Sequence, residues 1–119
     1  MVSASDTVKV AVIQCAPLPF DREGSVEKVI ELTKAVGVSG AKLALFPEAY
    51  VGGYPWGLAF GTAIGGRSPA GRRTWERCWS TAIDVPGPET DRLGEAAREA
   101  GLYLAVGVVE RDSSYSRGT

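Results

Sequence analysis

Three short apolar runs constrain the fold of this chain more than any other feature. They are "VKVAVIQ" (residues 8–14), "KLALF" (42–46) and "LYLAVGVVE" (102–110). Their length, their β-branched residues and their nearly unbroken apolar character are typical of buried strands. Because helical patterns separate the runs, the sequence predicts an α/β layer fold with a covered sheet.

Amphipathic helices are predicted between these strands. From Ser25 onward one face of a helix is apolar, and Gly37 and Gly40 follow as C-terminal stops. The apolar face contains Val26, Val29, Ile30, Thr33 and Val36. A second helix is predicted after the turn "VPGPET" (85–90), with Gly101 as its stop. Its apolar face contains Leu93, Ala96, Ala97 and Ala100.

The composition is that of an ordinary globular domain. The 119 residues are 45% hydrophobic and 23% charged, with a formal net charge of −1. This balance favours neither a nucleic acid nor an anionic membrane surface as a partner. No apolar run approaches the ~20 residues that a membrane-spanning helix needs, and the N-terminus lacks the pattern of a secretory signal. We therefore expect a cytoplasmic protein with a flexible N-terminal tail over residues 1–7.

The absence of histidine and the presence of two cysteines narrow the chemistry of the chain. Without histidine the chain contains neither a Cys-His nor a Ser-His-Asp arrangement, nor a zinc site with imidazole ligands. Cys15 and Cys78 are predicted to be free thiols, because no export signal precedes them. We expect each thiol to pack in the interior rather than to act as a nucleophile. Lys34 and Lys42 are expected to be solvated rather than catalytic.

The segment "LFPEAYVGGYPWG" (residues 45–57) places one carboxylate, Glu48, directly after the second predicted strand. Ligand crevices of α/β sheets form at the carboxyl ends of their strands. Pro47 restricts the local backbone, and Gly52 and Gly53 permit a tight reversal. A carboxylate that this reversal partly encloses has a raised pKa and can serve as a general base near neutral pH. The residues alone leave open a Glu48 that begins a loop and points to solvent.

Aromatic residues are expected to form the wall beside Glu48. Tyr54 is predicted either to line a substrate pocket or to hydrogen-bond the carboxylate, and Trp56 is predicted to shape that pocket. Packing alone also explains both residues. The stretch 48–74 is rich in glycine and lacks periodicity, which indicates a long loop. Its aromatic residues indicate that the loop is packed: Tyr50, Tyr54, Trp56 and Phe60. Residues 73–83 are compatible with a further helix.

Several segments resemble the nitrilase branch of the carbon–nitrogen hydrolase superfamily. "FPEAYVGGYP" (46–55) is similar to the glutamate motif of that branch, "VKVAVIQCAP" to its first strand and "GAKLALFPE" to its second. "VPGPETDRLGEAAREAGLYLAVGVVERD" is similar to its later helix and strand. The Gly-Tyr-Pro after Glu48 points to nitrilases proper, and "WGLAFGTAIGGRSPAGRR" resembles the corresponding loop of plant-type and related bacterial nitrilases. Ala44 departs from the larger aliphatic residue that is usual in the family.

The resemblance implies a fold, a mechanism and a role for Glu48. The fold is a four-layer α-β-β-α sandwich, of which residues 8–119 would be the incomplete N-terminal part. The catalytic set is a glutamate, a lysine and a cysteine, which work without a metal or an organic cofactor. Glu48 matches the glutamate, which acts as general base, whereas the lysine and the cysteine are expected beyond Thr119. Family members assemble into dimers and longer spirals, so the resemblance also implies a homo-oligomer. Three arginines of the long loop would then belong either to a subunit interface or to a solvated surface: Arg67, Arg72 and Arg73.

The resemblance implies that the function is hydrolysis of an organic nitrile to a carboxylic acid and ammonia. Two alternatives stay open. An amidase of the same superfamily would use the same three residues on an amide, and a truncated, non-catalytic chain would only associate with related subunits. Because the nucleophile is expected outside it, the 119-residue chain by itself is expected to have no nitrilase activity.

Overall fold

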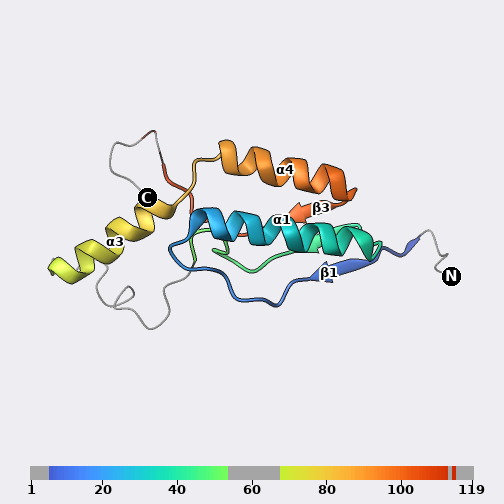
Figure 1. Cartoon of the computed structure of the whole chain (residues 1–119), viewed down its shortest axis with the longest axis horizontal. Helices are drawn as coiled ribbons and strands as arrows, with labels where there is room; N and C mark the ends of the chain where they lie inside the picture. Colours follow the sequence, from blue (N-terminus) through green and yellow to red (C-terminus); the bar gives the residue numbers. More distant parts are fainter. Residues whose placement is uncertain (1–5, 54–67, 113, 115–119) are drawn as a thin grey trace.

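The computed structural model describes residues 6–53, 68–112 and 114. Its elements, in chain order, are β1 (Val10–Val12), α1 (Arg22–Val38), β2 (Leu43–Leu45), α3 (Pro69–Thr81), α4 (Pro88–Ala100) and β3 (Tyr103–Ala105). The strands form a parallel sheet in the order β1-β2-β3. Helices α1 and α4 lie side by side, and α3 extends away from them (Figure 1). The predicted α/β class is confirmed. Among the described residues, no helix is both long enough and apolar enough to cross a membrane.

One face of the sheet, which we call the covered face, packs against α1 and α4. Successive side chains of a strand point to opposite faces, and the register places Ala11, Ala44 and Leu104 beside one another on this face. Ala44 is fully buried, and the other two pack against the core. The helices contribute Val26, Val29, Val36 and Leu93 to the same core. Each such buried aliphatic side chain stabilises the fold by about 1.5–3 kcal/mol.

The opposite face, which we call the open face, is exposed within the described part of the chain. Four of its large side chains are 45% to 81% exposed: Val10, Val12, Leu45 and Tyr103. Both helices lie on the same side of the sheet, so the predicted sheet is covered on one face only in this part of the chain, as expected of an incomplete sandwich. The strands are also shorter than the apolar runs that predicted them, with three residues each. Isolated bridges between residues 51 and 108 and between residues 83 and 110 continue the parallel pairing.

Helix α1 begins earlier than predicted, because Asp21 caps its N-terminus. The Asp21 carboxylate accepts a hydrogen bond from the N–H of Gly24 at 2.8 Å. Gly37, which was predicted as a stop, lies inside the helix, at a close approach to α4. A Cβ on Gly37 would lie 2.9 Å from the Cβ of Ala100. Gly40, with φ of 86°, follows the end of the helix as predicted.

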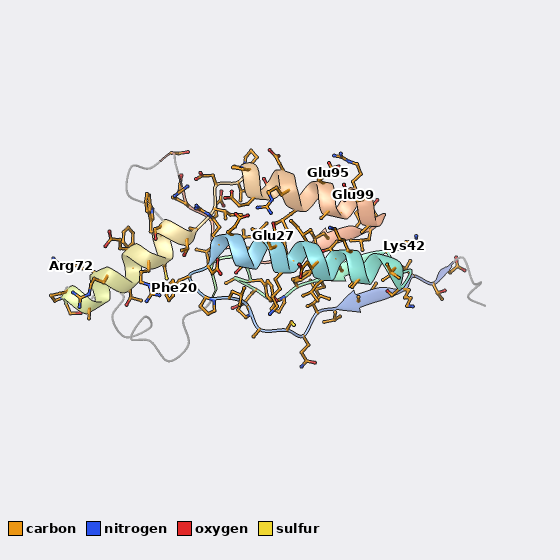
Figure 2. The ribbon with its side chains drawn as sticks, in the orientation of Figure 1. Phe20, Glu27, Lys42, Arg72, Glu95 and Glu99 are labelled. Atoms are coloured by element: carbon orange, nitrogen blue, oxygen red, sulfur yellow. The ribbon has the colours of Figure 1, made fainter. Side chains whose placement is uncertain are left out.

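Helix α3 shortens the predicted loop. The sequence indicated a loop to residue 74 and a helix over residues 73–83, but Ser68 caps a helix that already begins at Pro69. The guanidinium of Arg77 lies 4.1 Å from the centre of the Phe20 ring, which Figure 2 shows between α3 and α1. Arg72 lies toward the outer end of α3. Arg72 and Arg73 are exposed, and Arg67 lies outside the described residues.

Candidate functional site

The chain leaves β2 in a bulge that contains Glu48. The N–H of Phe46 donates to the carbonyl oxygen of Ala105 at 2.9 Å, and the N–H of Tyr50 donates to that of Gly107 at 2.9 Å. Between these two hydrogen bonds the segment after β2 runs from Phe46 to Tyr50, whereas the segment after β3 runs only from Ala105 to Gly107. Glu48 and its neighbours are left out of the ladder between these two bonds. The bulge lies at the carboxyl end of β2, so Glu48 lies where the sequence predicted it.

The segment 47–53, which we call the Glu48 turn, depends on left-handed backbone. Gly52 and Gly53 have φ of 109° and 78°, so the tight reversal predicted from these glycines is confirmed. Ala49 also has a positive φ, of 48°, which costs about 1–2 kcal/mol for a residue with a Cβ. The N–H of Gly53 donates to the carbonyl oxygen of Ala49 at 2.9 Å. A Cβ on Gly53 would lie 2.6 Å from the Cα of Pro19, so the end of the turn is tightly packed.

Gly107 holds the Glu48 turn from the side of β3. Its carbonyl oxygen accepts hydrogen bonds from the N–H groups of Tyr50 (2.9 Å) and Val51 (3.2 Å). A Cβ at this position would lie 2.5 Å from both the Cα of Glu48 and the N of Ala49. Real Cβ atoms essentially never come within 3.0 Å of another heavy atom in this way. Only glycine therefore fits here without a displacement of the Glu48 backbone.

Tyr50 anchors the same turn in the core. Its side chain is fully buried, and its ring meets the edge of the Phe46 ring with 5.3 Å between the centroids. Its hydroxyl donates to the carbonyl oxygen of Ala16 at 3.1 Å. Burial raises the pKa of Tyr50, and the adjacent Cys15 thiol raises it further, so the hydroxyl remains a donor at neutral pH. The packed position predicted for Tyr50 is confirmed.

The side chain of Glu48 is exposed. Within the described part of the chain, Gly107 packs against the backbone of the turn and not over the carboxylate. The apolar enclosure stays a prediction, because its wall was assigned to residues after Gly53. Tyr54 and Trp56, which were predicted to form the wall and to line a substrate pocket, lie outside the described residues. Glu48 is a carboxylate with a fixed backbone and an accessible side chain.

Two cysteines and two lysines were expected to take no part in catalysis, and the structure shows the environment of each. Cys15 and Cys78 are free thiols, as predicted. Cys15 is exposed, so the expected interior packing is wrong for it: β1 has ended, and the chain has left the covered layer. Burial raises the pKa of the Cys78 thiol against the opposing effect of Arg77, which leaves less of the reactive thiolate at neutral pH. Lys34 and Lys42 are exposed, as predicted.

The sequence reasoning missed Gly107, although a signal was present. A glycine inside an apolar strand run commonly marks a bulge or a close backbone approach, and Gly107 interrupts "LYLAVGVVE" in this way. The left-handed Ala49 carried no comparable signal, since alanine rarely adopts this conformation. Among the described residues, no group of three or more His, Cys, Asp or Glu side chains is placed to hold a metal ion.

Comparison with known proteins identifies the family. The carbon-nitrogen hydrolase family matches residues 9–118. An aliphatic nitrilase from Sinorhizobium fredii is 50% identical over 104 residues, which cover 87% of this chain and 34% of the relative. A bifunctional nitrilase/nitrile hydratase from Nicotiana tabacum is 41% identical over 110 residues (92% and 32%). An arylacetonitrilase from Trametes versicolor is 37% identical over 110 residues (92% and 34%).

The matches extend over almost all of this chain but only part of each relative. The chain spans 34%, 32% and 34% of the length of these three curated relatives. Because the family match covers far more than half of the residues and all three relatives are nitrilases by name, this chain belongs to the nitrilase branch of the carbon-nitrogen hydrolase family.

Proposed function

We propose that this chain is the N-terminal part of a nitrilase, which hydrolyses an organic nitrile to a carboxylic acid and ammonia with Glu48 as the general base. The observation that carries the proposal is the fixed backbone of Glu48 at the carboxyl end of the central strand, in a chain whose relatives are nitrilases. A general base must be held within hydrogen-bond reach of the proton that it accepts. The fixed backbone holds Glu48 in place, and the exposed side chain leaves its carboxylate within reach of such a proton.

In the proposed mechanism Glu48 serves successive proton transfers. It accepts the proton of a cysteine thiol, and the thiolate attacks the nitrile carbon. Glu48 returns that proton to the nitrile nitrogen, which gives a covalent thioimidate and restores the carboxylate. Water, deprotonated by Glu48, adds to the thioimidate, and ammonia leaves. A second water then hydrolyses the resulting thioester, which releases the acid and restores the thiol. A lysine stabilises the charge of the tetrahedral intermediates.

The remaining parts of the site are proposed to come from segments beyond those described. The lysine and the cysteine would follow Thr119, and Tyr54 and Trp56 would line the substrate pocket. The whole protein would be a four-layer α-β-β-α sandwich in which a second sheet covers the open face, and it would assemble as a homo-oligomer. The apolar character of the open face supports the second sheet, since large exposed apolar patches mark interaction surfaces.

The test is Glu48→Gln in the full-length gene product. Because this change removes the base and keeps its shape, we expect kcat to fall by about 10²- to 10⁴-fold with an unchanged Tm. The matched control is Glu99→Gln, which neutralises an exposed carboxylate on α4 (Figure 2) and is expected to keep the wild-type kcat. Wild-type turnover by the Glu48→Gln protein would contradict the proposal.

Two further measurements separate the proposal from its alternatives. Acid and ammonia are quantified from a nitrile and from the amide of the same acid, and turnover of the amide alone would identify an amidase. The purified 119-residue chain is assayed in parallel, and we expect no hydrolysis because it would lack the nucleophile. Hydrolysis by that chain would show that the nucleophile lies within it.

A further inference from the structure

The backbone of Glu48 is confined by contacts that no side-chain rotation relieves. The atoms nearest to a hypothetical Cβ on Gly107 are backbone atoms, the Cα and C of Glu48 and the N of Ala49, at 2.5 to 2.7 Å. The segment after β3 that contains Gly107 cannot retreat freely, because the Gly107 carbonyl oxygen accepts two hydrogen bonds from the same turn, those of Tyr50 and Val51. A methyl group at position 107 must therefore push the Glu48 backbone away from β3.

A second restraint acts from the other outer strand of the sheet. Tyr50 follows Glu48 by two residues, and its hydroxyl reaches the carbonyl oxygen of Ala16, in the segment that follows β1. Because the Tyr50 ring is fully buried against Phe46, the side chain has little freedom to follow a displaced turn. The turn is thus attached both to the β3 side and to the β1 side of the sheet, although it follows the central strand β2.

We propose that Gly107 and Tyr50 are positioning residues for Glu48. Gly107 sets how closely the Glu48 backbone approaches β3, and Tyr50 fixes the turn to the end of β1. Both act through the carboxylate and not on the substrate. This inference rests on the proposed role of Glu48 as general base. It adds that the role depends on Gly107 and Tyr50, which hold the Glu48 backbone in place.

The main test is Gly107→Ala in the full-length enzyme. A displaced base loses its alignment with the reacting atoms, and a misplacement of about 1 Å costs about a hundredfold in rate. We expect kcat, corrected for the folded fraction, to fall by about that factor while KM changes by less than about threefold, because the base acts in the chemical steps. An unchanged kcat in folded protein would overturn the inference. So would a rise in KM without a fall in kcat.

The matched control is Gly94→Ala. Gly94 lies inside α4, and a Cβ there would meet no atom within 4 Å. Since alanine favours a helix over glycine, this variant is expected to keep kcat and KM and to raise Tm. A fall in kcat for this variant comparable to that of Gly107→Ala would show that the assay responds to any added methyl group, and the inference would be overturned.

A double-variant cycle separates positioning from a general loss of structure. Glu48→Asp keeps a carboxylate but withdraws it by one methylene, so it misplaces the same group. If Gly107 acts through Glu48, the two losses in kcat are less than multiplicative when they are combined. Fully multiplicative losses at equal folded fraction would overturn the positioning role.

Tyr50→Phe provides a milder variant that keeps the buried ring. It removes the hydrogen bond to Ala16, and we expect kcat to fall by about fivefold with an unchanged KM. This variant decides the test if Gly107→Ala does not fold, and a wild-type kcat would then overturn the inference. Glu48→Gln is measured beside it: retained activity there contradicts the proposed function itself, whereas an inactive Glu48→Gln together with unaffected positioning variants contradicts only the positioning role.

Discussion

The two faces of the sheet contain similar residues in different surroundings. On the covered face Ala44 is fully buried beneath α1 and α4, and Leu104 packs against the same core. On the open face Val12 is 70% exposed and Tyr103 is 81% exposed. The strands that carry both sets are nearly uniform apolar runs, which is the pattern of strands covered on both sides. The difference therefore reflects what packs on each face and not what each face is made of.

This comparison bears on the proposed sandwich. When one face of a sheet is buried and the other is solvated, apolar and polar residues normally alternate along each strand. The residues of β1 show no such alternation. The open face thus has the composition of a core surface, which supports a second layer in the whole protein. Substitutions on the two faces test that reading, and they do so with effects of decreasing size.

The largest effect is expected from Ala44→Asp on the covered face. A carboxylate at a fully buried site must be desolvated or protonated, so we expect the free energy of unfolding of the whole protein to fall by at least about 4 kcal/mol. Urea unfolding and the yield of folded protein measure this loss. Val38→Asp, at a position that is 90% exposed, is the control and is expected to cost less than about 1 kcal/mol. Equal costs for both would show that the covered face is not core.

A smaller effect is expected from Val12→Thr on the open face. Threonine keeps the shape and the β-branching of valine, so the change reports the cost of burying a hydroxyl. If a second sheet covers this face, the full-length protein should lose about 1.5 kcal/mol of unfolding free energy. The control Val38→Thr should stay within about 0.5 kcal/mol of wild type. A cost as small for Val12→Thr would mean that the open face meets water in the whole protein, against the proposed sandwich.

Thr33 offers a test of opposite sign on the covered side. Thr33 lies on the buried side of α1, and its side-chain oxygen lacks a hydrogen-bond partner among the described residues. Thr33→Val keeps the shape and removes the unpaired hydroxyl, so we expect a gain of about 1 kcal/mol in unfolding free energy. Thr81→Val is the comparison, since that hydroxyl donates to the carbonyl oxygen of Arg77 at 2.8 Å and its removal should bring no gain. A loss of stability in Thr33→Val would reveal a partner for the hydroxyl, such as a buried water.

The comparison of the faces also shows which parts of the fold and of the candidate site the sequence could predict. Helical periodicity predicted α1 and α4, and the position of Glu48 after an apolar run predicted its place at a strand end. Periodicity along one strand cannot say which layer covers each face, because that depends on residues far away in the chain. The close contact between Gly107 and Glu48 is of the same kind, since it joins segments that only the folded sheet brings together. The caps Asp21 and Ser68 were readable locally and were missed.

Beyond β3 the parallel pairing continues at the carboxyl edge of the sheet, between residues 83 and 110, and an ion pair supports it. The N–H of Arg111 donates to the carbonyl oxygen of Ile83 at 2.7 Å. The guanidinium of the same residue donates two hydrogen bonds to the Asp84 carboxylate, at 3.1 and 2.8 Å. These hydrogen bonds hold the pKa of Asp84 below its ordinary value of 3.8. The edge therefore contains a group whose contribution to stability depends on pH.

The smallest effect is expected from Asp84→Asn. Because folding lowers the pKa of Asp84, its stabilising effect is fully present above pH 3.8 and is lost as the pH falls through the lower folded value. Asp84→Asn should lower Tm slightly at neutral pH, and the difference from wild type should disappear in acid. The effect is small because the Asp84 side chain is 41% exposed and solvent screens the pair. Thermal melts of both proteins at several pH values measure it, and other carboxylates cancel in the difference. A Tm difference that persists unchanged at pH 2 would contradict this prediction, because it would show that the ionised state of Asp84 is not the source of its contribution to stability.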